Sequence, residues 1–118
     1  MFKYYNNNSQ GLFVDDCTIR AIATATDSTW DDTYIHLCNQ ARLQGKILND
    51  RTFIRGYLDT NYTRVRELPY RVGNVAYEYS NNVLLITMKG HITCSRYGTI
   101  YDTFDCRDRI AEDAWIIK

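Results

Sequence analysis

The chain has 118 residues, of which 45% are hydrophobic and 24% charged, and this length and composition suit one globular domain. Its 14 basic and 14 acidic residues balance, so the net charge gives no reason to expect a nucleic-acid partner or an acidic membrane surface. No apolar run approaches the roughly 18 residues of a membrane-spanning helix, and residues 1–10 lack the apolar core of a signal peptide. We therefore expect a cytoplasmic protein with no membrane partner.

Four cysteines are present, and in a cytoplasm we expect them to be reduced. They include no CxxC pair, so neither structural zinc nor another cofactor is expected. Cys38 and Cys94 fall on apolar faces of a predicted helix and a predicted strand, and we interpret them as core residues. Cys106 lies in a polar segment and is an alternative exposed thiol, although no histidine is near it in the sequence or in the predicted strand pairing.

Three helices are predicted in the first half of the chain. Acidic capping residues precede a helix from about Cys17 to Thr26, and a second helix starts after Ser28 or Thr29 and ends near Gly45. A third helix follows its predicted cap, Asp50. Each segment places its apolar residues on one helical face.

After residue 61 the chain changes to short runs rich in Val, Ile, Tyr and Thr, which are typical of strands. The runs are YTRVREL, VLLITM, HITCSRYG, TIYDTF and AWII. Helices followed by strands with short connections predict an α+β fold, in which N-terminal helices pack on a C-terminal antiparallel β-sheet. We expect a single domain over 1–118, with a helical half at about 15–60 and a sheet half at about 61–118.

Cys17 is the candidate nucleophile. At the first turn of a helix, unpaired N–H groups and the helix dipole favour a negative sulfur and lower the thiol pKa. The same N–H groups can bind the oxyanion that forms when the sulfur attacks a carbonyl carbon. The carboxylates of Asp15 and Asp16 oppose a thiolate, so a base is needed.

The chain has two histidines, and they lie in different settings. His36 falls on a predicted helix face away from the apolar stripe, and we interpret it as a solvated surface residue. His91 follows a tight Lys89-Gly90 turn and begins a strand, where a side chain is both accessible and held by the sheet. This position suits a general base. The alternative is a histidine that is hydrogen-bonded at a strand end for structure alone.

A carboxylate beside His91 would fix the imidazole tautomer and stabilise the imidazolium. If the following hairpin has a two-residue loop, Arg96 pairs with Thr99 and Asp102 lies diagonally beside His91 on the same face. A loop one residue longer would place Asp105 there instead. The two-residue loop is the simpler hairpin and favours Asp102.

Two stretches, DDCTIRAIATATDSTWDDTY at 15–34 and GHITCSRYGTIYDTFDCRDRIAEDAWII at 90–117, resemble small papain-like cysteine-peptidase-fold proteins of bacteria and their phages. Those proteins carry an Asp-Cys-x-x-Arg-Ala helix start, a later Gly-His strand, and a Tyr-Asp-Thr strand followed by an aromatic. The resemblance implies a papain-like fold in a bacterial or phage-infected cytoplasm. It assigns Cys17 as nucleophile, His91 as base and Asp102 as the orienting acid.

Papain-like enzymes usually place a glutamine a few residues before the nucleophile, where it donates to the oxyanion. Gln10 precedes Cys17 and is the candidate, although it also fits a plain turn residue in NNNSQG. The Cys-Gly or Cys-Trp pair that is usual in these enzymes is absent, because Thr18 follows the cysteine. The fold is therefore better supported than any particular peptide specificity.

The leading hypothesis is a thiol hydrolase that acts on an amide or thioester bond of a protein or peptide substrate through an acyl-enzyme. The alternative is a catalytically silent binding protein that keeps the fold and blocks a target protein such as a host factor. Its contact surface would be the segment 42–71, where seven basic residues accompany three acidic ones; the simpler interpretation of this segment is a solvated face. A third hypothesis, metal chemistry at Cys17, His91 and Asp102, lacks closely spaced ligand pairs.

Overall fold

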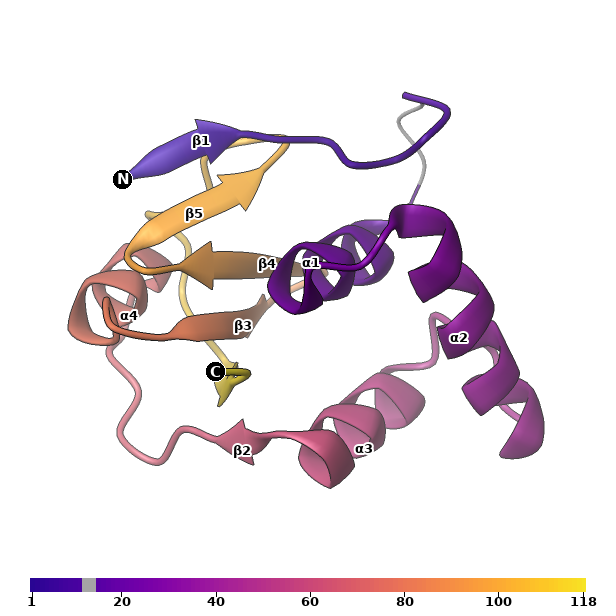
Figure 1. Cartoon of the computed structure of the whole chain (residues 1–118). Coiled ribbons are helices and arrows are strands. Elements are labelled where there is room, and N and C mark those ends of the chain that lie inside the picture. Colours follow the sequence, from indigo (N-terminus) through magenta and orange to yellow (C-terminus); the bar gives the residue numbers. More distant parts are fainter. Residues whose placement is uncertain (12–14) are drawn as a thin grey trace.

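The computed structural model describes residues 1–11 and 15–118 and has an α+β fold (Figure 1). Within these residues the helices are α1 (Cys17–Thr26), α2 (Trp30–Leu43), α3 (Arg51–Asn61) and α4 (Val72–Glu78). The strands are β1 (Phe2–Tyr4), β2 (Thr63–Arg64), β3 (Val83–Met88), β4 (His91–Arg96), β5 (Thr99–Asp102) and β6 (Asp113–Ile116). The six strands form one sheet in the order β1-β5-β4-β3-β6-β2.

The first three helices begin where capping residues predict them. The Thr29 side chain accepts a hydrogen bond from the Asp32 N–H, and the Asp50 side chain accepts from the N–H groups of Thr52 and Phe53. At the start of α1 the expected side-chain cap is wrong. Asp16 occupies the N-cap position but makes no side-chain capping hydrogen bond, because its carboxylate is turned to tertiary partners described below.

The sheet is mixed, which corrects the expectation of a wholly antiparallel sheet. β3, β4, β5 and β6 pair antiparallel as expected, but β1 pairs in parallel with β5 at the sheet edge. The three residues of β1 are too few to show an alternating pattern in the sequence. The β4–β5 hairpin has the expected register, with Arg96 opposite Thr99, and this register positions the end of β5 beside the start of β4.

Helices cover both faces of the sheet. The sequence did not predict α4, which lies on the face opposite α1, α2 and α3. On one face, α1, α2 and α3 pack on Leu85, Ile92 and Trp115. On the other face, α4 packs with Leu84, Ile86 and the buried Cys106. The alternation of Leu84 and Leu85 between the two clusters follows from the two-residue period of a strand.

The segment 103–112 folds back over α4, and one glycine makes this approach possible. The N–H of Gly73 donates to the carbonyl of Arg107 at 2.9 Å. A Cβ at position 73 would lie 3.1 Å from the Arg107 Cβ and 3.2 Å from its carbonyl oxygen. The glycine therefore allows a close backbone contact, which brings Cys106 onto the sheet.

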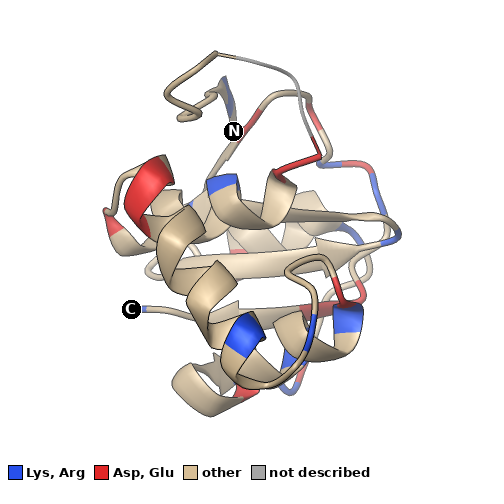
Figure 2. Ribbon diagram, turned by 90° about the vertical axis from the view of Figure 1, so that its right-hand side faces the viewer, with Lys and Arg blue, Asp and Glu red and all other residues tan. Residues whose placement is uncertain are grey.

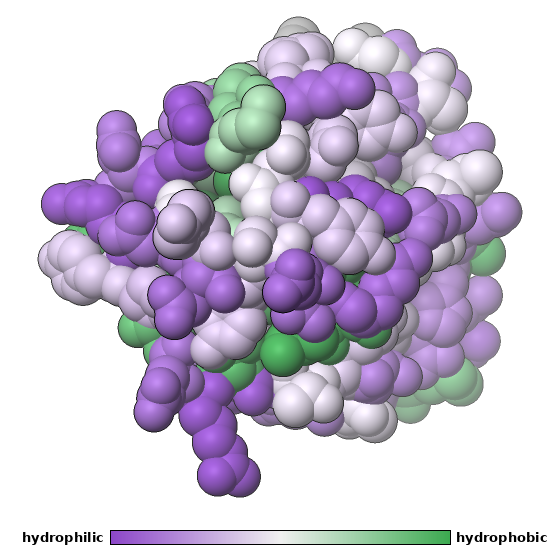
Figure 3. Space-filling view, turned by 60° about the vertical axis from the view of Figure 1, so that its left-hand side comes forward, coloured by the Kyte–Doolittle hydropathy of each residue, from purple (hydrophilic) through white to green (hydrophobic). Residues whose placement is uncertain are grey.

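The surface carries charges of both signs rather than one basic face. In Figure 2, acidic and basic residues are interspersed over the side of the molecule that α2 faces. The arginines of the segment 42–71 include several in ion pairs: Arg51 with Glu112 at 3.0 Å, Arg55 with Asp113 at 2.6 Å, and Arg64 with Asp59 at 2.7 Å. The side shown in Figure 3, where α4 lies, is mostly hydrophilic with small separate hydrophobic patches. Among the described residues, no helix has the length and hydrophobicity needed to cross a bilayer.

Candidate active site

Three sequence-predicted residues meet at the end of the sheet. Cys17 is the first residue of α1, His91 is the first residue of β4, and Asp102 is the last residue of β5. The packing of α1 on β4, through Ile19, Ile22 and Ile92 among others, holds the helix N-terminus at this end. Cys17 and His91 line the same cleft.

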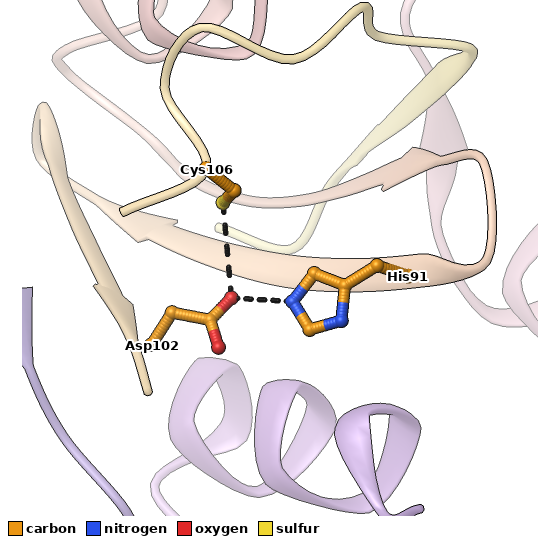
Figure 4. Close-up of side chains that lie close together, drawn as sticks. All are labelled: His91, Asp102 and Cys106. Carbon is orange, nitrogen blue, oxygen red and sulfur yellow. Dashed lines mark hydrogen bonds and ion pairs between the residues drawn. The ribbon is translucent and has the colours of Figure 1, made fainter. Parts of the chain in front are cut away.

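His91 is hydrogen-bonded to Asp102 through its Nε2 atom. The His91 Nε2 lies 2.7 Å from Asp102 Oδ2, and the Thr103 N–H donates to Asp102 Oδ1 at 2.7 Å. The Asp102 side chain is 2% exposed and that of His91 is 8% exposed, so water competes little for this hydrogen bond. In Figure 4 the second ring nitrogen points away from Asp102, which leaves Nδ1 for the nucleophile.

The Cys17 sulfur lies beside His91 and Ile92 in this cleft, close enough for the His91 ring and the Ile92 backbone to lower the pKa of the thiol. Burial alone would raise the pKa of the Cys17 thiol, but the hydrogen bond and the charge of His91 outweigh it, so the pKa lies below its ordinary value. Burial disfavours imidazolium as well, yet hydrogen bonds to Asp102 and Cys17 raise the pKa of His91 to about 9. Both shifts favour a thiolate–imidazolium pair at neutral pH.

Asp102 rather than Asp105 supports His91. Burial raises the pKa of the Asp102 carboxyl, but hydrogen bonding with His91 reverses this and the net direction is downward. Asp105 is exposed and forms its ion pair with Arg107 at 2.7 Å.

Phe104 covers the site, with its ring centroid 4.7 Å from that of His91 and an interplanar angle of 45°. The ring limits access of water to the His91–Asp102 hydrogen bond.

The cleft beside Cys17 has a volume of about 230 Å³. Its walls come from the start of α1, from α3 and from the β3–β4 turn. The residues that line it are Asp15, Cys17, Thr18, Asn49, Arg51, Ile54, Arg55, Thr87, Met88, Gly90, His91, Ile92 and Glu112. The unpaired N–H groups at the α1 N-terminus are the donors here that suit an oxyanion.

Gln10 lies in a turn and is exposed, and its backbone N–H donates to Asn8 Oδ1 at 2.9 Å. It does not line the cleft that holds Cys17. Residues 12–14, which connect it to α1, lie outside the described residues. The assignment of Gln10 as an oxyanion donor therefore stays a prediction.

Cys106 was expected to be an exposed thiol, and this expectation is wrong, because the residue is fully buried. Its Sγ lies 3.8 Å from Asp102 Oδ2 (Figure 4), and burial raises the pKa of its thiol to about 12. The polar neighbours Asp105 and Arg107 suggested exposure, whereas the decisive signal is the long-range contact of this segment with α4, which no local pattern contains.

His91, Asp102 and Cys106 each offer one possible metal-ligand atom, and these three atoms all lie within 4.8 Å of one another. Two of them already share a hydrogen bond, and the Arg20 guanidinium lies 3.2 Å from the other oxygen of Asp102. This positive charge opposes a second cation at the same carboxylate. We therefore interpret Cys106 as a weak thiol donor to Asp102.

The remaining histidine and cysteines lie away from this site. His36 is exposed, as predicted, and its Nε2 lies 3.0 Å from the Tyr57 hydroxyl. Cys94 is buried in the core under α1, as predicted, and Cys38 is half-buried.

Comparison of the chain with protein-family models, with curated proteins and with solved structures found no match.

Proposed function

We propose that the protein is a thiol hydrolase with a papain-like mechanism, in which Cys17 attacks the carbonyl carbon of an amide or thioester. The observation that carries the proposal is that His91 is hydrogen-bonded to Asp102 through Nε2 while Cys17 lies beside His91 in the same cleft. A nucleophile, a base and a group that orients the base are the parts this chemistry requires.

The reaction proceeds in two stages. The Cys17 thiolate forms a bond to the carbonyl carbon, and the negative charge moves to the oxygen, which the α1 N-terminus stabilises. The His91 imidazolium gives its proton to the departing nitrogen or sulfur as that bond breaks, which leaves an acyl thioester on Cys17. Neutral His91 then takes a proton from water, the water oxygen attacks the thioester, and the carboxylic acid leaves while the Cys17–His91 ion pair is restored.

A papain-like fold is part of this proposal. Its support is the chain order of nucleophile, histidine and aspartate, together with a nucleophile that opens a helix packed against antiparallel hairpins. The same arrangement occurs in the family that the two stretches at 15–34 and 90–117 resemble.

Native alkylation tests the proposal. We expect iodoacetamide at pH 7 to modify Cys17 at least ~10-fold faster than any other cysteine, because a thiolate is the reactive form. Cys94 and Cys106 are buried and are expected to react only after denaturation. Mass spectrometry of peptides from timed samples gives each rate.

Equal, slow modification of all four cysteines would contradict the hydrolase proposal and favour the silent binding protein. If Cys17 alone is modified fast, the next experiment is a search for acyl transfer from peptide thioesters, with Cys17→Ser as the inactive control.

A further inference from the structure

Arg20 lies one helical turn after Cys17 and connects two carboxylates. Its Nε donates to Asp16 Oδ1 at 2.8 Å, and its Nη1 donates to Asp102 Oδ1 at 3.2 Å. Nη1 also lies 3.3 Å from Thr103 Oγ1. The side chain is 13% exposed, so these ion pairs are only weakly screened by solvent.

Asp16 directly precedes the nucleophile in the sequence, and its carboxylate has several hydrogen-bond partners. Besides Arg20, it accepts a hydrogen bond from Trp30 Nε1 at 2.9 Å and from Asn8 Nδ2 at 3.2 Å. Asp16 is 4% exposed. A buried carboxylate at this position, without a positive partner, would repel a thiolate on Cys17.

We propose that Arg20 is a positioning residue for the nucleophile: its guanidinium holds Asp102 against His91 and neutralises Asp16 beside Cys17. The proposal depends on the proposed function only in taking Cys17 as the nucleophile. A continuous line of charges then runs from Asp16 through Arg20 and Asp102 to His91. It explains how a cysteine that follows two acidic residues keeps a reactive sulfur.

The direction of the effect follows from the charges. Without Arg20, the charge of the Asp16 carboxylate acts on Cys17 uncompensated. The charge of Asp102, which Arg20 no longer balances, then offsets more of the positive charge of His91 that acts on the sulfur. His91 is already protonated below about pH 9, so a stronger pull from Asp102 adds no further imidazolium at neutral pH. Both consequences raise the pH at which the thiolate forms.

The other charged groups around Cys17 do not replace Arg20. Those that line the cleft are Asp15, Arg51 and Arg55, His91, and Glu112. Arg51 is paired with Glu112 and Arg55 with Asp113, so the charges on α3 largely cancel locally. Asp15 is exposed and solvent screens it.

The test is the pH dependence of Cys17 alkylation by iodoacetamide in the wild type, Asp16→Asn, Arg20→Gln and the double variant. We expect Arg20→Gln to raise the midpoint of the reactivity curve by about one pH unit, and Asp16→Asn to reverse most of this shift in the double variant. Arg66→Gln, which removes an exposed charge remote from the cleft, serves as the matched control and should leave the midpoint unchanged.

A purely structural role predicts a different result: Arg20→Gln would lower the melting temperature and leave the midpoint at its wild-type value, which would overturn the proposal. If Arg20→Gln alone does not fold, the double variant is compared with Asp16→Asn, since this pair leaves no orphaned buried charge at position 16. The midpoint must still be higher in the double variant, and equality would overturn the proposal. A wild-type midpoint near that of an ordinary thiol would instead count against the proposed function.

Discussion

Replacement of His91 by alanine is expected to slow alkylation of Cys17 at pH 7 by about 50-fold. The variant loses the hydrogen bond and the positive charge that lower the Cys17 pKa, while the burial that raises it remains. An ordinary thiol is only a few per cent thiolate at neutral pH, and iodoacetamide reacts with the thiolate. Rates are measured at Cys17 itself by mass spectrometry, so that slow reaction at other cysteines does not enter.

His36→Ala is the matched control, because His36 is exposed and contacts Tyr57 rather than the cleft. It should alkylate at the wild-type rate. If His91→Ala also reacts at the wild-type rate, His91 is not the base of Cys17.

Replacement of Trp115 by alanine is expected to lower the free energy of unfolding by about 4 kcal/mol. Trp115 is fully buried in β6, opposite Leu85, and packs under the helical layer. Its Nε1 donates to Asp59 of α3 at 2.9 Å, and the Arg64 guanidinium lies 5.2 Å from its ring. The substitution thus removes a large core side chain and the tie between α3 and the sheet.

Urea unfolding followed by circular dichroism measures this loss. Tyr77→Ala is the control, since Tyr77 is an aromatic of similar size that is 82% exposed, and it should change the unfolding free energy by less than about 0.5 kcal/mol. A loss below about 1 kcal/mol for Trp115→Ala would mean that the core does not depend on this residue. A loss of the whole transition in both variants would point to a nonspecific effect.

The hairpin that carries the site is the part the sequence predicts best. Tyr97 and Gly98 both adopt positive φ, 51° and 89°, which is the conformation of a tight two-residue hairpin turn. The loop length fixes the register, and the register places Asp102 beside His91. Local turn chemistry was therefore enough to select Asp102 over Asp105.

What the sequence could not show is carried by contacts between distant segments. Cys106 is buried because residues 103–112 fold over α4, and β1 reaches the sheet edge by pairing with β5. Arg20 follows Asp16 by four residues, a spacing at which opposite charges on a helix commonly pair, and the two side chains do form an ion pair. The second bond, to Asp102 at the far end of the chain, has no local signal.

The most direct test of the central claim, that Cys17 is a thiolate paired with a protonated His91, is a titration of the His91 ring followed by ¹⁵N NMR. The wild-type ring should be protonated at pH 7 and titrate at about pH 9, and Cys17→Ala should lower this midpoint by about one unit because the negative sulfur is lost. A His91 that titrates near its ordinary value of about 6.5, and that does so equally with and without the Cys17 sulfur, would contradict the pairing and the mechanism built on it.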